Sequence, residues 1–116
     1  MIKFKVKAEM KGADKKLSKY HQAAQPIFSS EVLKDSNYYA PQHTGNLIAS
    51  SQRSSDFERG KLVWDTEYAQ RLYYNPQYNF SKDKNPNARG LWFEAAKSSF
   101  SGRWKKTLEA LKKRYI

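Results

Sequence analysis

The N-terminal segment alternates strictly between apolar and polar residues. The even-numbered positions from Ile2 to Met10 are apolar, and the odd-numbered positions between them carry three lysines and Glu9. A period of two residues is typical of a strand that is buried on one face and exposed on the other. The pattern therefore predicts a strand over residues 2–10, and its lysine-lined outer face discourages edge-to-edge aggregation.

Two longer segments have the periodicity of helices. Between residues 13 and 38, apolar side chains recur every three or four positions, which predicts a long helix. Pro26 lies within this segment and lacks a backbone N–H, so we expect a kink or two abutting helices there. Between Phe93 and Tyr115, a second apolar stripe has lysines on its other faces. This segment predicts an amphipathic helix with a cationic surface, weakened or bent at Gly102.

Shorter elements are predicted between these helices. Thr44 follows a turn-like stretch and is a suitable N-cap for a short helix that reaches about Ser51. Residues 53–57 and 61–66 are interpreted as the two strands of a hairpin, with Gly60 in the turn.

The remaining segment and the order of elements indicate the fold class. Residues 68–74 have helical spacing, whereas residues 75–90 are polar and have no periodicity, so we expect a mobile surface loop there. The chain is short enough to form one domain, residues 1–116. We predict an α+β fold in which a small, mainly antiparallel sheet, made of the N-terminal strand and the central hairpin, is packed by a long N-terminal helix and a C-terminal amphipathic helix.

The charge is strongly positive. The chain has 22 Lys and Arg residues against 11 Asp and Glu residues, a formal net charge of +11. This excess favours a nucleic acid, an anionic surface or an acidic protein as a partner. Rings at Tyr78, Phe80 and Trp92 accompany the loop cations, as in single-strand binders, although a solvated loop with rings folded into the core explains the pattern equally well. The last helix could contact phosphates or present a hydrated face. The candidate partner or DNA contacts are Lys82, Lys84, Arg89, Lys105, Lys106, Lys112 and Lys113.

The composition offers little for chemistry. There are no cysteines, which excludes disulfides and thiolate metal sites. No segment has the pattern of a signal peptide or the length of a membrane span, so an aqueous, cytoplasmic setting is expected. Neither His21 nor His43 has a partner at metal-site spacing, and neither the acid pairs at 56/58 and 65/67 nor the serines at 50–55 match a catalytic pattern. We predict a protein that is not an enzyme and needs no cofactor.

Four motifs follow one another between about Tyr39 and Ala96, which is roughly half of the chain. Residues 39–50 read Tyr-Ala-Pro-Gln-His-Thr-Gly-Asn-Leu-Ile-Ala-Ser, and Gly60–Trp64, 67–74 and 87–94 follow in order. Together they resemble the Y-x-P-x-x-T-G-x-L-x-x-S segment, glycine-turn strand, Y-A-x-x-L-Y helix and W-F helix start of tailed-phage neck proteins. That family comprises minor capsid proteins of phages of Gram-positive bacteria and head–tail joining or tail-completion proteins. The matching residues are Tyr39, Pro41, Thr44, Gly45, Leu47, Ser50, Tyr68, Ala69, Leu72 and Trp92.

The resemblance implies a structural role in the virion. It implies a non-enzymatic neck subunit that is made in the host cytoplasm and assembles as a ring of copies around the DNA channel. The implied partners are other neck, portal-adaptor or tail proteins and the DNA that passes through, without a membrane. The matching residues are then scaffold positions rather than a chemical site. The alternative function is a small basic nucleic-acid-binding module, whose affinity would fall steeply with salt.

Overall fold

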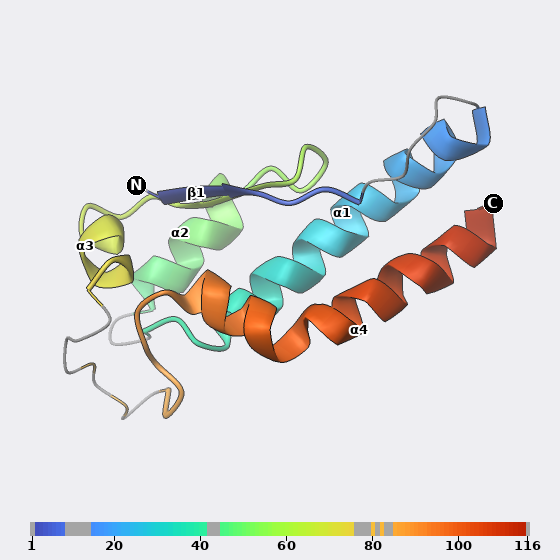
Figure 1. Cartoon of the computed structure of the whole chain (residues 1–116). Helices are drawn as coiled ribbons and strands as arrows, with labels where there is room; N and C mark the ends of the chain where they lie inside the picture. The colour runs from blue at the N-terminus through green and yellow to red at the C-terminus, as the bar shows by residue number, and fades with distance from the viewer. Residues whose placement is uncertain are drawn as a thin grey trace.

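The computed structural model describes residues 2–8, 15–41, 45–75, 80, 82 and 85–115, with the backbone alone for residues 15–18 and 115. Strands and helices follow one another without βαβ alternation (Figure 1). The elements are β1 (Ile2–Lys5), α1 (Lys15–Asn37), α2 (Asn46–Ser54), β2 (Lys61–Trp64), α3 (Ala69–Tyr73) and α4 (Trp92–Tyr115). The predicted α+β class is confirmed.

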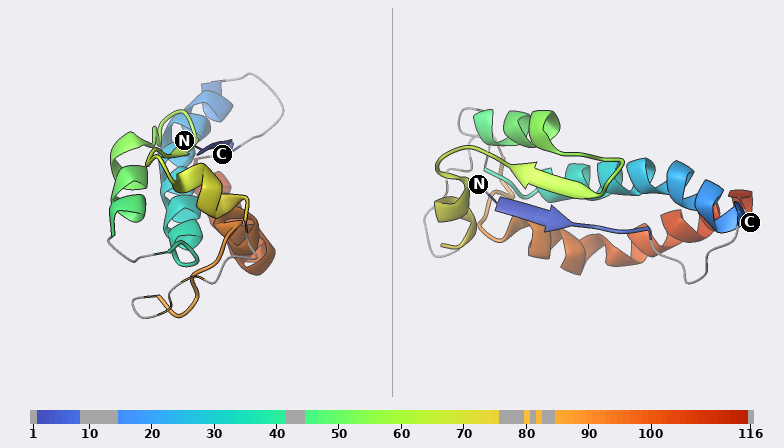
Figure 2. Two further views of the ribbon diagram at one scale, coloured as in Figure 1. Left: turned by 90° about the vertical axis from the view of Figure 1, so that its left-hand side faces the viewer. Right: turned by 90° about the horizontal axis from the view of Figure 1, so that it is seen from above.

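Two long antiparallel helices, α1 and α4, run the length of the molecule (Figures 1 and 2). The molecule measures 48 × 24 × 19 Å along its principal axes, so it is elongated. Pro26 lies inside α1, which nevertheless continues as one helix instead of the alternative of two abutting helices. Ala24 and Val32 of this helix are fully buried, and such packing outweighs the loss of one helical hydrogen bond. None of the helices in the described ranges is long and apolar enough to cross a lipid bilayer.

The sheet has two antiparallel strands and lies on one side of the long helices (Figure 2). Ile2 is opposite Trp64, and Lys5 is opposite Lys61. Even-numbered side chains of the N-terminal segment face the core, and Lys3, Lys5 and Lys7 are exposed. The predicted alternation is thus confirmed through residue 8, although the strand itself ends at Lys5.

The predicted hairpin is wrong in its first strand. Residues 53 and 54 belong to α2, which extends to Ser54, and the segment that follows makes only an isolated bridge between Asp56 and Lys61. The partner of β2 is therefore β1, which is distant in sequence. The helix continues because its inner face, Leu47, Ser50 and Ser51, is buried against the rest of the domain.

Gly60 makes the close approach between the turn and the N-terminal strand possible. Its φ is +71°, and a Cβ at this position would lie 2.0 Å from the carbonyl oxygen of Val6. The Val6 N–H donates to the Gly60 carbonyl at 2.8 Å, and Gln25 Nε2 donates to the Val6 carbonyl at 2.9 Å. Only glycine combines this φ with this proximity, so the predicted role of Gly60 in the turn is confirmed.

The core contains a cluster of aromatic rings between the sheet and the helices. Trp64 of β2 meets Trp92 of α4 edge-on with ring centroids 5.9 Å apart, and Trp92 meets Tyr73 of α3 at 4.7 Å. Phe4 stacks on Phe93 at 4.5 Å. Such ring pairs stabilise a core beyond the area they bury, and here they join both strands to α3 and α4.

Candidate assembly surfaces

Most of the motif residues within the described ranges are buried where elements meet, whereas Gly45 is exposed and Pro41, Tyr68 and Leu72 are partly buried. Ser50, Ala69 and Trp92 are fully buried, and Leu47 is almost so. Tyr39 donates its hydroxyl hydrogen to Ser99 Oγ of α4 at 2.9 Å, which ties the end of α1 to α4. These buried positions hold elements together, and their role as scaffold residues of the family stays a prediction.

Several motif residues meet at one cleft. A mainly apolar cleft of about 340 Å³ lies between the start of α2 and α3. Gly45 precedes α2 with a φ of +77° and occupies its N-cap position. The prediction that Thr44 caps this helix concerns a residue outside the described ranges. The lining residues are Pro41, Gly45, Asn46, Leu47, Tyr68, Arg71 and Leu72.

The serines of α2 have a structural role that the sequence did not reveal. Ser55 Oγ accepts the Val63 N–H at 3.0 Å, and Ser50 Oγ accepts the Asp65 N–H at 3.2 Å. Ser51 Oγ accepts from Asn37, whose Oδ1 accepts the indole N–H of Trp64 at 3.0 Å. Ser55, the C-cap residue of α2, thus satisfies an outward N–H of β2, and Ser50 satisfies the N–H that follows the strand. A serine every few residues before a strand was the available signal.

The segment 75–90 is held to the body at its C-terminal end. Asn85 is buried, and its Nδ2 donates to the carbonyls of Tyr38 and Ala40 at 2.9 and 2.8 Å. Arg89 donates its backbone N–H to Tyr39, and its guanidinium lies 4.7 Å from the centre of the Tyr39 ring. These contacts attach residues 85–90 to the segment after α1, and the expected mobility of the loop stays a prediction.

The described residues show only part of the proposed mixture of cations and stacking rings. Trp92 is fully buried and T-stacked in the core, so it offers no face to a base. Phe80 is partly buried and Lys82 is exposed. Tyr78 and Lys84 lie outside the described residues.

The cationic face of α4 is exposed as predicted. Trp104 is buried, whereas Lys105 and Lys106 beside it are exposed. Lys112 and Lys113, in the last turns, are exposed as well. The four lysines therefore form a solvent-facing strip along the half of α4 that is distant from α3 (Figure 1).

A polar cluster that periodicity did not identify fastens α1 to α4. Asp35 is 4% exposed and accepts the indole N–H of Trp104 at 2.6 Å. Arg103 also donates to Asp35 and lies 3.5 Å from Glu31. The hydrogen bond with Asp35 raises the pKa of the Arg103 guanidinium, so this group stays charged. An acid on the buried stripe of α1, three positions after Val32, was the sequence signal.

An open groove lies beside this cluster. It has a volume of about 680 Å³ and is bounded by α1, α2 and α4. Tyr38 lines it and is 51% exposed, and Phe100 and Ile48 add partly buried apolar surface. Exposed large apolar residues in a groove are typical of protein–protein interaction surfaces.

The described residues offer no arrangement for catalysis. No group of three or more His, Asp or Glu among them could hold a metal ion. His21 packs against the ring of Tyr20 at 5.4 Å, and Asp65 accepts hydrogen bonds from Arg53 and Ser54. His43 lies outside the described residues. Asp56, Asp65 and the serines that were considered for chemistry make structural contacts, and the two glutamates, at positions 58 and 67, are exposed.

Comparison with known proteins gives one extensive match. A family model described as "Minor capsid protein" matches residues 4–112. A polyphosphatidylinositol phosphatase, INP53, of Saccharomyces cerevisiae is 29% identical over 86 residues, which are 74% of this chain but only 7% of the yeast protein. No solved structure matches the chain.

Proposed function

Because the chain belongs to the minor capsid protein family and is thus a structural component of a phage virion, we propose that it forms part of the neck, as a ring of copies around the DNA channel. The match spans residues 4–112, so it includes both long helices and the sheet. The structural character of the family agrees with a role without catalysis. The ring would connect portal-adaptor, other neck or tail proteins.

Two different surfaces support assembly into a closed ring. Subunits in a ring contact one another head to tail, so each subunit must offer two complementary and unlike patches. One candidate is the apolar groove of α1, α2 and α4, where Tyr38 is exposed. The other is the end formed by α3 and the cleft beside it, where Tyr74 is 57% exposed. An aromatic ring from one end could fill the groove of the next copy.

The observation that carries the proposal toward the DNA channel is the strip of lysines on α4. Lys105, Lys106, Lys112 and Lys113 face solvent, and the apolar side of the same helix is packed against the core. A ring that lines a DNA passage needs a surface that attracts phosphates without base-specific contacts. The strip meets that requirement, and it could alternatively contact an acidic neighbour.

The test removes the strip and counts joined particles. Phages carry Lys105→Gln with Lys106→Gln, or Lys112→Gln with Lys113→Gln, and electron microscopy counts free heads, free tails and joined virions. A control pair, Lys19→Gln with Lys97→Gln, removes the same charge from exposed positions of α1 and α4 that lie outside the strip and outside the groove. We expect separate heads and tails for the α4 pairs and normal virions for the control. Unchanged virion yield and infectivity for both α4 pairs would refute the proposal.

A free nucleic-acid-binding module is the second candidate, and the same lysine strip favours it. Binding through phosphates releases counterions, so the affinity of such a module for duplex DNA falls steeply as salt rises. Filter binding of the purified chain at several salt concentrations distinguishes the two functions. Tight, salt-sensitive binding of duplex DNA by a chain that does not associate with copies of itself would favour this candidate.

A further inference from the structure

The outer edge of β1 has unpaired backbone groups. The hydrogen-bond pattern of β2 reveals which residues of β1 face outward. Lys61 exchanges both backbone hydrogen bonds with Asp56, so its backbone N–H and C=O point away from β1. Because Lys5 lies directly opposite Lys61, the backbone N–H and C=O of Lys5 must point away from β2. The same holds for Val63, whose N–H goes to Ser55, and for Lys3 opposite it. No described residue provides a hydrogen-bond partner for the N–H and C=O groups of Lys3 and Lys5 on this edge.

The two edges of the sheet therefore differ in whether their backbone groups have hydrogen-bond partners among the described residues. On the edge of β2, Ser55 Oγ accepts the outward N–H of Val63, and Asp56 exchanges both backbone hydrogen bonds with Lys61. Figure 2 shows β2 between α2 and β1, with the other long edge of β1 directed away from α2. A free strand edge is a template for the addition of another strand, and no described residue pairs with this one.

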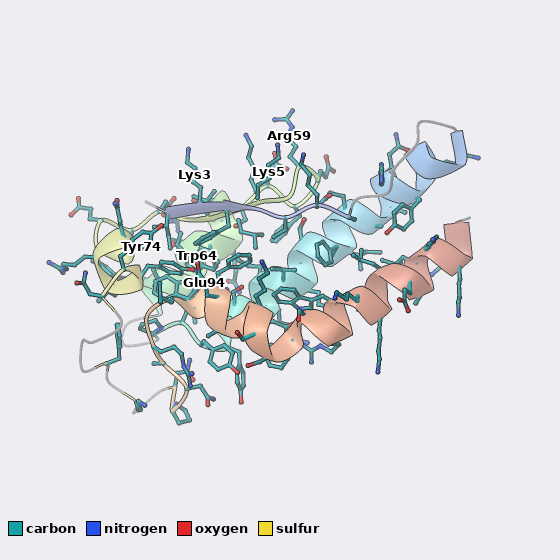
Figure 3. The ribbon with its side chains drawn as sticks, in the orientation of Figure 1. Lys3, Lys5, Arg59, Trp64, Tyr74 and Glu94 are labelled. Atoms are coloured by element: carbon teal, nitrogen blue, oxygen red, sulfur yellow. The ribbon has the colours of Figure 1, made fainter. Side chains whose placement is uncertain are left out.

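The charge around this edge selects the chemistry of a partner. Lys3, Lys5 and Arg59 point away from the body on the outer face of the sheet, and Trp64 and Glu94 lie on its other side (Figure 3). Lys5 is directly opposite Lys61 in the strand register, and like charges at such positions destabilise a sheet. An acidic group beside them would relieve that repulsion.

The inner side of the same edge is apolar and incompletely covered. The rings of Phe4 and Phe93 stack, yet both residues remain partly exposed. A strand added next to β1 would alternate its side chains between the lysine face and these rings. The two sides thus require acidic and apolar residues at alternate positions.

We propose that the free edge of β1 accepts, as a third strand, an extended segment of a partner protein in which acidic and apolar residues alternate. Main-chain hydrogen bonds to Lys3 and Lys5 supply binding, and the charge alternation supplies specificity. A second copy of β1 is a poor occupant, because it would bring lysines against lysines. This inference does not rest on the position of the protein in the neck.

The test uses the full chain and a synthetic peptide, acetyl-Thr-Glu-Val-Glu-Val-Glu-Thr-amide. NMR measures binding and the hydrogen exchange of individual backbone amides. The amides of Lys3 and Lys5 should gain protection with the peptide, whereas that of Phe4, already directed toward Leu62, should not change. A peptide of the same composition with its three glutamates adjacent is the sequence control, and duplex DNA is the competitor.

Variants separate strand addition from general attraction by charge. Lys3→Glu with Lys5→Glu should weaken peptide binding at least about tenfold, and Lys3→Ser with Lys5→Ser should weaken it less. Both sites are exposed, and circular dichroism verifies the fold. Lys112→Glu with Lys113→Glu, on α4, should leave binding unchanged. Absence of binding at millimolar peptide, binding without protection at Lys3 and Lys5, equal loss in the α4 variant, or exclusive binding of DNA would each overturn the proposal.

Discussion

Replacement of Gly60 by alanine should destabilise the fold by several kcal/mol, because the added methyl group has no room. The methyl carbon would lie 2.0 Å from the Val6 carbonyl oxygen and 2.7 Å from Gln25 Nε2. Relief of this overlap requires the segment after β1 to move by about 1 Å, since real contacts of this kind are not shorter than about 3 Å. That displacement breaks the hydrogen bonds of Val6 with Gly60 and with Gln25.

The magnitude follows from these parts. The left-handed backbone at +71° costs an alanine about 1 kcal/mol. The two hydrogen bonds contribute about 1 kcal/mol each. The sum is about 3 kcal/mol, a large fraction of the about 5–15 kcal/mol that stabilises a typical domain.

Two other glycines serve as graded controls. Gly45 has a φ of +77° with no atom within 4 Å of an added methyl group, so Gly45→Ala should cost only about 1 kcal/mol. Gly102 lies in α4 with equally open space, and Gly102→Ala should stabilise the protein by about 0.5–1 kcal/mol. Urea unfolding monitored by tryptophan fluorescence measures all three variants. Equal costs for Gly60→Ala and Gly45→Ala would refute the proposed close approach at Val6.

Three further predictions concern single side chains. Asp35→Ala should lower the free energy of unfolding by about 2–3 kcal/mol in urea, because it leaves the buried indole N–H of Trp104 without an acceptor. Asp35→Asn keeps an acceptor and should cost about half as much. Equal costs for the two variants would contradict this. Burial raises the pKa of Tyr20 above 10.0. The folded state therefore holds the phenol proton more tightly than the unfolded chain, and stability is lost as the pH rises above that value. The stability of the wild type relative to Tyr20→Phe should accordingly fall as the pH rises above about 10, and a constant difference would oppose the argument. Asn85→Ala should accelerate limited proteolysis within 75–90, since its amide holds two backbone carbonyls, while proteolysis at the wild-type rate would show that the anchor is dispensable.

Periodicity predicted the elements whose burial depends on their own sequence. The alternation of β1 and the apolar stripes of α1 and α4 appear in the structure because each presents one continuous face to the core. The order of the elements was enough to assign the α+β class.

The pairing of strands could not be predicted from local pattern. Gly60 and the residues on both sides of it resemble a hairpin, but β2 pairs with β1, far away in sequence, and Arg53 and Ser54 are helical. Serine hydroxyls accept backbone N–H groups in and just after β2 that a neighbouring strand could otherwise bind, and these contacts form only in the tertiary structure.

The candidate site was predicted in part. The exposure of Lys105 and the neighbouring lysines follows from the spacing of apolar residues along α4, which can be read from the sequence. The anchoring of the last part of the loop by Asn85 and the link between Asp35 and Trp104 depend on residues that are 45 to 69 positions apart. Such contacts have no periodic signature, and only the folded chain reveals them.

The central claim is that this minor capsid protein forms a ring in the neck. The most direct measurement is cryo-electron microscopy of purified phage particles at a resolution that distinguishes the paired helices α1 and α4. We predict a closed ring of copies between the portal and the tail, with the lysines of α4 toward the DNA or an acidic neighbour. Density for the chain in the icosahedral shell or the distal tail, or its absence from particles, would contradict the account.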